Sequence, residues 1–470
     1  MEPEAITFAD RATAVRDPAV LAARRSAAGR TYRVAALIGL FVFVVLNANG
    51  REIPASDSQA AKYASVALAR RGALTLDGLV GRVPQYGERL AFQRDREGHW
   101  RNAYPLPPVL EGAAVAAILK GLGLVQLDAR LAPALVAKLT ASALVSLASA
   151  IAFVIAVRFC RRGPAALVAV GFALASGLWP TASQTLWQHA TVVWSVALAV
   201  CLWVSRADRD GRIPYHLAAG LLLGWAASAR PQTLPMLLIL SAGILWRSPA
   251  PRRIAFAIAF LLPLTVFAGL NVRWFGDPFG SLHAFEAASL AAHRVESTWQ
   301  FPLAGAVGLL VSPSRGLLVF SPIVLIVLGA RPRDPAERTV LRVTIAAAAV
   351  QLIVYASFSV WWGGHTYGPR YILDGLPLLI PAAALGVARI GRAPHLVAAG
   401  AVAALLWSIA TGATGAFCYP HDGWNTDPAS VDHFHERLWD VRDSQIPRCW
   451  ARGPSPQNFA LFTRDAWRRN

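Results

Sequence analysis

The feature that most constrains this chain is a series of long apolar runs separated by short basic gaps. A backbone that crosses hydrocarbon must satisfy its own hydrogen bonds, so each run of about 17–25 apolar residues predicts a transmembrane helix. Of the 470 residues, 55% are hydrophobic and 15% are charged, which is too apolar for a soluble protein of this length. The sequence therefore predicts an all-α polytopic membrane helix bundle with about eleven transmembrane helices. They lie near 33–49, 132–157, 164–180, 190–205, 216–230, 232–247, 254–271, 315–330, 340–358, 373–389 and 395–412.

A further stretch, at 105–125, decides the sidedness of everything that follows it. It contains three prolines together with Glu111 and Lys120. If it does not span, the later basic gaps share one side with the arginine-rich N-terminus, as the positive-inside rule requires. We therefore interpret 105–125 as a membrane-parallel helix. The N-terminus is then cytoplasmic, the C-terminus is extracytoplasmic, and 33–49 is a signal anchor that is not cleaved.

This topology divides the chain into three parts. Residues 1–32 form a basic cytoplasmic tail, which we expect to be disordered. Residues 33–412 form the transmembrane domain, whose first outer loop is 50–131 and carries the membrane-parallel helices. Residues 413–470 form an extracytoplasmic tail. Because the long polar segments after residue 33 fall on the outer side, we expect the working site there.

The cysteines and the charge narrow the class of protein further. Cys418 and Cys449 both lie in the outer tail, where an oxidising compartment would let them form a disulfide. No cysteine or histidine spacing indicates a zinc site, and we assign no metal. The net charge of +18 comes from arginines spread between apolar runs rather than gathered on one soluble domain, so nucleic acid is not an expected partner.

The first outer loop contains the sharpest local signal. The segment from Ser56 to Gln59 predicts a capping box, with Ser56 as the cap, that opens an amphipathic helix along the outer membrane surface. Asp57 then occupies the first helical position, where the helix dipole favours a charged carboxylate. Such a group can act as a general base or bind a cation. The alternative is that aspartate is there only because it favours first turns of helices.

Three further outer turns carry arginines. Arg370 ends the glycine-rich run 361–371, Arg315 lies in the Ser-Pro-Ser-Arg-Gly segment at 312–316, and Arg230 precedes a proline between two predicted helices. A guanidinium binds phosphate bidentately, so these are candidate phosphate ligands. The alternative for each is an interfacial arginine that reaches toward lipid headgroups.

Several other side chains on the same face are candidate substrate contacts. His189, in the second outer turn, could handle a proton, bind a sugar or simply begin a helix at the interface. The other candidates are His365, Tyr367, Trp362 and Gln59.

The order of these features resembles the GT-C superfamily of polyprenyl- or dolichyl-phosphate-sugar-dependent glycosyltransferases. The resemblance is to the branch of protein mannosyltransferases and lipid A aminoarabinose transferases, and it covers about residues 33 to 375. The matching features are Asp57 with its amphipathic helix, the proline-rich segment 104–108, Asp128-Ala-Arg130, Arg230-Pro231, 312–322 and 361–371.

The resemblance implies an inverting hexosyl or pentosyl transfer from a polyprenyl-phosphate donor to an acceptor hydroxyl. The acceptor would be a glycan, lipid or protein at the extracytoplasmic face of the bacterial inner membrane, and the lipid-phosphate sugar would serve as donor substrate without a further cofactor. Asp57 would orient or deprotonate the acceptor, and Arg370, Arg315 and Arg230, in that order, would hold the lipid phosphate.

The chain departs from the family pattern in two places. Many relatives carry a second acid after the first, but Ser58 follows Asp57 here, and His189 stands where many have an acid in the second outer turn. Either Asp57 acts alone as base, or one of Glu88, Asp77 and Glu286 contributes, or the chain is a divergent member with altered chemistry.

Two rival functions stay open. A transporter or flippase for an anionic lipid or polyprenyl-linked sugar would favour charges within the spans, where Lys138 is one of few. A polymer ligase of the outer leaflet would usually show one much longer outer loop.

Overall fold

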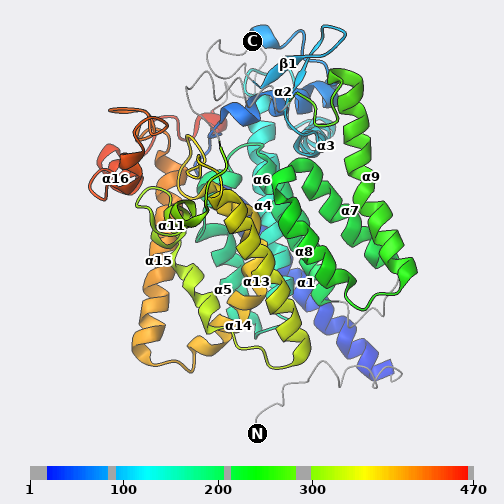
Figure 1. Ribbon diagram of the computed structural model, residues 1–470, viewed down its shortest axis with the longest axis vertical. Helices are drawn as coiled ribbons and strands as arrows, with labels where there is room; N and C mark the ends of the chain where they lie inside the picture. The colour runs from blue at the N-terminus through cyan, green and yellow to red at the C-terminus, as the bar shows by residue number, and fades with distance from the viewer. Residues whose placement is uncertain (1–17, 83–90, 206–212, 282–297, 464–470) are drawn as a thin grey trace.

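The computed structural model describes residues 18–82, 91–205, 213–281 and 298–463, and most of its helices run along its long axis (Figure 1). Within these residues, six helical segments are long and apolar enough to cross a membrane. The chain is thus an integral membrane protein. The six segments are α1 (Pro18–Asn47, apolar from Ala28), α4 (Ala132–Ala156), α9 (Ala250–Phe275), α13 (Pro335–Ala356), the 3₁₀ helix η6 with α14 (Arg370–Leu379 and Ile380–Ile390), and α15 (His395–Cys418).

The other predicted spans also contain helices, but these are shorter. They are α5 (Arg162–Leu174), α6 (Gln188–Val204), α7 (Ile213–Ala229) and α8 (Leu234–Leu245), the last preceded by η4 (Pro231–Thr233). The prediction of one continuous helix at 315–330 is wrong. This stretch forms α12 (Leu317–Phe320) and the 3₁₀ helix η5 (Pro322–Gly329), divided at Pro322, which lacks the N–H needed to continue a helix.

Two more differences from the sequence-based predictions concern the start of the first helix and the class of the fold. Residues 18–32, expected as part of a disordered tail, belong to α1. The fold is mostly helical rather than all-α, because β1 (Phe92–Arg94) and β2 (Trp100–Asn102) form an antiparallel pair in which Phe92 faces Asn102. The remaining short elements are η1 (Val80–Arg82), α11 (Leu303–Val311), the π-helical turn η2 (Leu178–Ala182), η7 (His435–Trp439) and η8 (Ala460–Phe462).

The first outer loop forms a layer at one end of the bundle. Figure 1 shows α2 (Ser56–Arg71), α3 (Pro107–Gly121) and β1 there, near the C-terminal end and opposite the N-terminal end of α1. Ser65 of α2 donates a hydrogen bond to the carbonyl oxygen of Val109 in α3 at 3.0 Å. This close approach requires glycine at 112, since a Cβ there would collide with the Ser65 hydroxyl.

Glu111 attaches α3 to the bundle. Its carboxylate accepts hydrogen bonds from Thr191 Oγ1 at 2.5 Å and from the indole nitrogens of Trp194 and Trp225, both at 2.9 Å. An acid in an apolar helix is tolerated where several donors satisfy it. Among the described residues, α3 is not one of the helices long enough to span.

Buried polar groups and small residues hold the bundle together. Lys138 of α4 is buried and donates to Leu46 O and to Gln184 Oε1, both at 2.7 Å, so it ties α4 to the end of α1 and to the second outer turn. Gly220 and Gly224 on α7 let its backbone pack directly against the carbonyl oxygens of α9.

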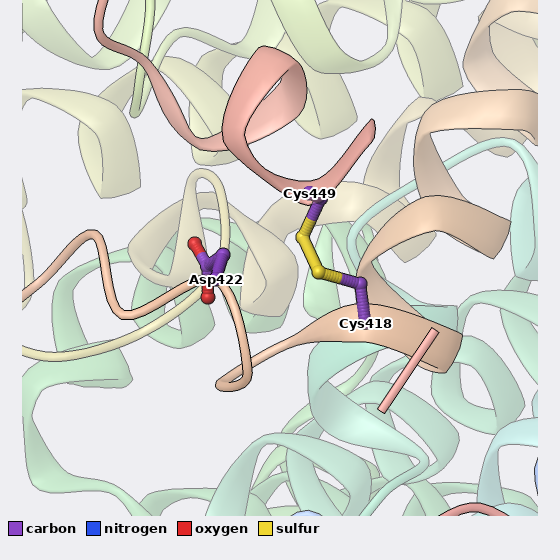
Figure 2. Close-up of side chains that lie close together, drawn as sticks. All are labelled: Cys418, Asp422 and Cys449. Carbon is purple, nitrogen blue, oxygen red and sulfur yellow. A yellow bond between two sulfur atoms is a disulfide. The ribbon is translucent and has the colours of Figure 1, made fainter. Parts of the chain in front are cut away.

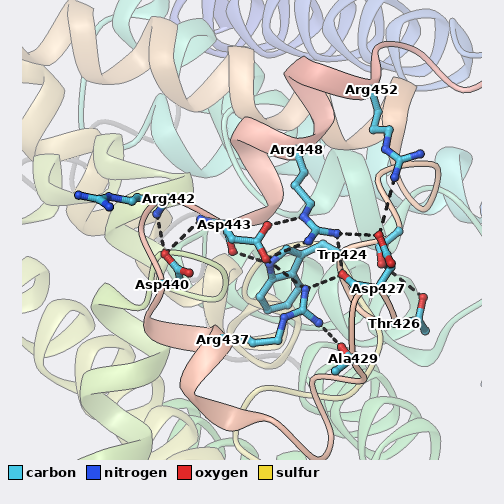
Figure 3. Close-up of polar contacts among 11 residues, drawn as sticks. Trp424, Thr426, Asp427, Ala429, Arg437, Asp440, Arg442, Asp443, Arg448 and Arg452 are labelled. Carbon is cyan, nitrogen blue, oxygen red and sulfur yellow. Dashed lines mark hydrogen bonds and ion pairs between the residues drawn. The ribbon is translucent and has the colours of Figure 1, made fainter.

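The tail after α15 folds back onto the outer turns. Cys418 and Cys449, expected to pair, form a disulfide that links the end of α15 to α16 (Gln445–Arg452) (Figure 2). Farther along the tail, Trp424 is fully buried and donates from Nε1 to Asp443 O at 2.7 Å. Figure 3 shows Arg437 and Arg448 converging on the Asp443 carboxylate, which closes this segment on itself.

Candidate functional site

Asp57 lies at the start of α2, on the outer layer. The helix begins at Ser56 with Ala55 as its N-cap, and Ser58 Oγ accepts from Ala55 N at 3.2 Å. The prediction that Ser56 caps the helix and Gln59 reaches back is therefore wrong by one residue. Ala55 is the N-cap, and Ser58 takes the role expected of Gln59. Asp57 Oδ2 forms an ion pair with Nη1 of Arg370 at 3.2 Å, although the two residues are 313 positions apart. The Asp57 side chain keeps 31% of its surface exposed.

Arg370 begins η6, directly after the glycine-rich turn. Gly363, Gly364 and Gly368 all have positive φ, a conformation that glycine adopts without strain and that brings Arg370 back over α2. Its guanidinium lies over the rings of Trp187 at 4.9 Å and Tyr371 at 5.3 Å. Among the described residues, Arg370 Nε has no hydrogen-bond partner. The guanidinium thus pairs with one carboxylate and retains donors for an anion.

Asp374, one turn farther along η6, is the central acid of the site. It is fully buried, and its Oδ1 lies 2.8 Å from His189 Nδ1. Its Oδ2 lies 2.8 Å from Arg230 Nε and accepts from the Tyr355 hydroxyl at 3.3 Å. Sequence reasoning missed this residue. The available signal was an aspartate inside a predicted span, which marks a functional or paired position.

Aromatic rings complete the surroundings of Arg230. Its Nε donates to the Tyr355 hydroxyl at 2.6 Å, and its guanidinium lies 5.3 Å from the Tyr355 ring and 5.8 Å from the Tyr371 ring. The two tyrosine rings stack at 4.4 Å with an interplanar angle of 7°. We call the set Asp57, His189, Arg230, Arg370 and Asp374 the arginine–aspartate cluster.

A second polar network lies under the start of α2. Ser58, which stands where relatives were expected to have a second acid, accepts a hydrogen bond from Thr185 at 3.0 Å. The same Thr185 hydroxyl lies 2.6 Å from Glu52 Oε1, and Glu52 Oε2 pairs with Lys62 at 2.8 Å. The second carboxylate near Asp57 therefore comes from Glu52, but it is buried and already paired.

Arg315 does not fit the predicted role of phosphate ligand. It is fully buried and donates to Trp362 O at 2.9 Å, Gly364 O at 3.0 Å and Asn425 Oδ1 at 2.7 Å. Burial lowers the pKa of Arg315 to about 10. With these donors committed to protein oxygens, Arg315 fastens the tail to the glycine-rich turn.

The other predicted substrate contacts lie mostly outside the cluster. His365 and Trp362 both bind the Asp432 carboxylate of the tail, at 3.1 and 2.9 Å. Tyr367 is buried and donates to Thr411 O of α15 at 3.0 Å. Gln59 is buried on α2, two residues after Asp57. Of the predicted substrate-binding residues, His189 is the one that the structure places in the cluster.

The alternative bases are accounted for as far as the structure describes them. Asp77 accepts from Trp100 N at 2.8 Å and pairs with His99 at 2.8 Å on the surface hairpin. Glu88 and Glu286 lie outside the described residues.

Within the described residues, one group of side chains has the spacing of metal ligands, namely Cys418, Asp422 and Cys449 (Figure 2). The two sulfur atoms are bonded to each other, so the thiolates that such a site needs are oxidised. Burial raises the pKa of Asp422 to about 6, even though Arg315 nearby favours the charged form.

The fold and cluster define an integral membrane protein with a charged site near one end of its helix bundle. Its arrangement of helices is similar to that of ArnT from Cupriavidus metallidurans bound to undecaprenyl phosphate (TM-score 0.44, 12% identity over 79% of this chain and 62% of ArnT). It is also similar to the oligosaccharyltransferase of Archaeoglobus fulgidus in complex with Zn and sulfate (TM-score 0.42, 12% identity over 90% of this chain and 58% of that protein).

The chain spans less than two thirds of the length of either protein. The likeness concerns the fold alone, and no residue role follows from it. No protein-family model and no curated protein matches the sequence.

Proposed function

We propose that this chain is an inverting glycosyltransferase that moves a sugar from a polyprenyl-phosphate donor to an acceptor hydroxyl. The observation that carries the proposal is the Asp57–Arg370 pair at 3.2 Å. It sets a partly exposed carboxylate, which can accept a proton, beside a guanidinium, which can bind a phosphate. Both groups are needed where an alcohol replaces a phosphate at a sugar carbon.

The transfer is a single displacement. The acceptor oxygen attacks the anomeric carbon, and the bond between that carbon and the phosphate oxygen breaks with inversion. Asp57 receives the hydroxyl proton as the new bond forms. Arg370 binds the leaving lipid phosphate and stabilises the negative charge that grows on it, which lowers the barrier. Arg230 adds a second positive charge, held by Asp374 and Tyr355.

Two adjoining cavities support a lipid donor. The larger, of about 170 Å³, lies among α5, η5, α14 and α15 and has an almost wholly apolar lining, including Phe172 and Leu405. A small cavity at its side is lined by Gly368 and Pro369, directly before Arg370. Ser176 and Ser321 line both. A prenyl chain in the larger cavity would lie beside the small cavity and the residues that precede Arg370 in the chain.

The sidedness of the site supports an extracytoplasmic reaction. Helix α2, which carries Asp57, lies with α3 and β1 at the end of the bundle opposite the N-terminal end of α1 (Figure 1). The disulfide at the same end suits an oxidising compartment. We therefore infer a bacterial inner-membrane protein with a cytoplasmic N-terminus and an extracytoplasmic C-terminus, acting on a glycan, lipid or protein acceptor.

The test is transfer of a radiolabelled hexose or pentose from a polyprenyl-phosphate donor by purified protein supplied with a membrane extract. We expect labelled product with wild type and a loss of at least about 100-fold with Asp57→Asn, the size typical of losing a general base. Asp277→Asn, an exposed aspartate at the end of α9, is the matched control and should keep full activity. Unchanged transfer by Asp57→Asn contradicts the assigned base.

The same preparation separates the rival function. Reconstituted in vesicles, a transporter or flippase would move the lipid-linked sugar between leaflets without forming any glycosidic product. That outcome would overturn the proposal.

A further inference from the structure

The charges of the arginine–aspartate cluster cancel before any substrate enters. Asp57 and Asp374 contribute two negative charges, and Arg230 and Arg370 contribute two positive charges. A phosphodiester bound beside Arg370 would add one negative charge to this largely buried group. Burying a net charge is costly unless a proton or counterion compensates it.

His189 is placed to supply that compensation. Its Nδ1 lies 2.8 Å from Asp374 Oδ1, and the ring is 1% exposed. Its second nitrogen, Nε2, is buried and has no hydrogen-bond partner among the described residues. The His189 ring lies 5.7 Å from Trp187, and Trp187 in turn lies under Arg370 at 4.9 Å. Trp187 thus contacts both the His189 ring and the guanidinium that we assign to the phosphate.

The charged groups on the elements packed against α6 have partners elsewhere. Lys138 of α4 donates to Leu46 O and Gln184, and Glu111 of α3 accepts from Thr191, Trp194 and Trp225. Tyr355 and Tyr371 contribute rings and hydroxyls around Arg230. Histidine is the side chain whose charge ordinarily changes between pH 5 and 8. His189 is therefore the histidine of the cluster, and it combines a carboxylate partner at Nδ1 with a second nitrogen that has no partner among the described residues.

We propose that His189 takes up one proton when a lipid phosphate binds beside Arg370, and that Asp374 positions the imidazolium so formed. The inference rests on the proposed function, because that function supplies the phosphate. The proton restores the charge balance of the cluster. Asp374 stabilises the cation by accepting a hydrogen bond from Nδ1–H. Binding of the donor is therefore linked to pH, and it weakens as the pH rises.

The experiment measures proton uptake directly. Farnesyl methyl phosphate is a suitable probe, because this prenyl phosphodiester carries one negative charge that does not titrate near neutral pH. It is titrated calorimetrically into purified full-length protein at pH 7.5 in Hepes and in Tris, whose ionisation enthalpies differ. The difference in apparent binding enthalpy between the buffers gives the number of protons taken up per ligand bound.

We expect wild type to take up about one proton, since one histidine changes its charge. His189→Gln should take up close to none and bind about tenfold more weakly, because the negative charge of the ligand is then not compensated by a proton. Asp374→Asn should also reduce the uptake, because the imidazolium loses its carboxylate. His433→Gln, at an exposed position in the tail, is the matched control and should behave as wild type. Near-ultraviolet circular dichroism establishes that each variant is folded.

The other outcomes distinguish failure of the inference from failure of the proposed function. Binding by wild type without proton uptake overturns the inference, and so does unchanged uptake in folded His189→Gln. Sugar transfer by wild type together with either result leaves the proposed function standing. If wild type binds no prenyl phosphodiester and transfers no sugar, the proposed function fails and the inference fails with it.

Discussion

At the scale of single residues, Arg370 is the proposed phosphate ligand best supported by its surroundings. Its guanidinium pairs with Asp57 and lies over the rings of Trp187 and Tyr371. Arg315 carries the same charge, but its guanidinium nitrogens already donate hydrogen bonds to main-chain and asparagine oxygens. Because the two arginines differ in free donors rather than in charge, substitutions that keep the charge distinguish them.

Arg370→Lys should lower the rate of sugar transfer by about 10–100-fold, because lysine keeps the charge but loses the bidentate fork. Arg442→Lys, at an exposed position of the tail, serves as control. Initial rates at saturating donor measure the effect. A rate for Arg370→Lys equal to that of the control would show that the fork has no part in the reaction.

Asp422 provides a pH-dependent prediction that is independent of catalysis. Burial raises its pKa from 3.8 to about 6, so the folded protein holds this proton more tightly than the unfolded chain. Its contribution to stability is present below about pH 4 and is lost as the pH rises through about 6. Asp422→Asn cannot ionise and avoids this loss, which amounts to up to about 3 kcal/mol.

The apparent Tm in detergent should therefore be higher for Asp422→Asn than for wild type at pH 8, and the difference should shrink at pH 5. Asp440→Asn, in an exposed part of the tail, should show no such trend. A difference that is the same at both pH values would mean that Asp422 does not titrate in this range.

The sequence alone located candidate residues where a local pattern marks the position. The positions of Asp57 and Arg370 follow from a helix start and a glycine-rich turn, and topology alone predicted that both lie on one side. Asp374 was missed because its partners, His189, Arg230 and Tyr355, come from three distant segments. The committed donors of Arg315 could not be foreseen, because its partners come from the glycine-rich turn and from Asn425 of the tail, which are distant in the sequence.

At the scale of elements, the pair α7 and α9 shows how small residues set helix packing in this bundle. Gly224 faces the carbonyl oxygen of Phe260, and Gly220 faces that of Phe256 one turn earlier. Helices approach this closely in membranes where the interface lacks side chains.

Gly224→Ala should destabilise the protein, because the new methyl group would collide with the Phe260 main chain and force the helices apart. We expect a loss of about 1–3 kcal/mol, as for other overpacked sites. Gly269→Ala on α9 is the matched control, since its Cβ would meet no atom within 4 Å. Thermal unfolding of both variants in detergent compares them. Equal Tm values would show that α7 and α9 are not in direct contact there.

The elements themselves were predictable to different degrees. Apolar runs located the helices. Hydropathy does not detect where a helix is interrupted, as at Pro322, so 315–330 was predicted to be one span. The hairpin of β1 and β2 was not predicted, because its three-residue strands carry too little alternation to be recognised. The helix at 105–125 lies in the outer layer, where Glu111 secures it to α6 and α7.

At the scale of the whole molecule, the proposed function depends on which side of the membrane the cluster faces. The cluster gathers residues from α2, α6, η6 and the turn before η4, and all of them meet near one end of the bundle. If that end faced the cytoplasm, a donor presented at the outer surface would not reach Asp57.

Cysteine accessibility in cells tests this sidedness. With Cys160 and Cys201 replaced by alanine, His433→Cys in the tail should react with a membrane-impermeant maleimide added to intact spheroplasts. His395→Cys, exposed at the opposite end of α15, should react only after permeabilisation. The reverse labelling pattern would place the arginine–aspartate cluster in the cytoplasm.

The central claim is that Asp57 and Arg370 together exchange a lipid phosphate for an acceptor hydroxyl at one sugar carbon. The most direct measurement counts lipid phosphate released and glycosidic bonds formed by purified protein from one polyprenyl-phosphate sugar. The account predicts equal amounts with wild type and neither product above background with Asp57→Asn. Release of lipid phosphate by wild type without glycoside formation, or equal product from wild type and Asp57→Asn, would contradict it.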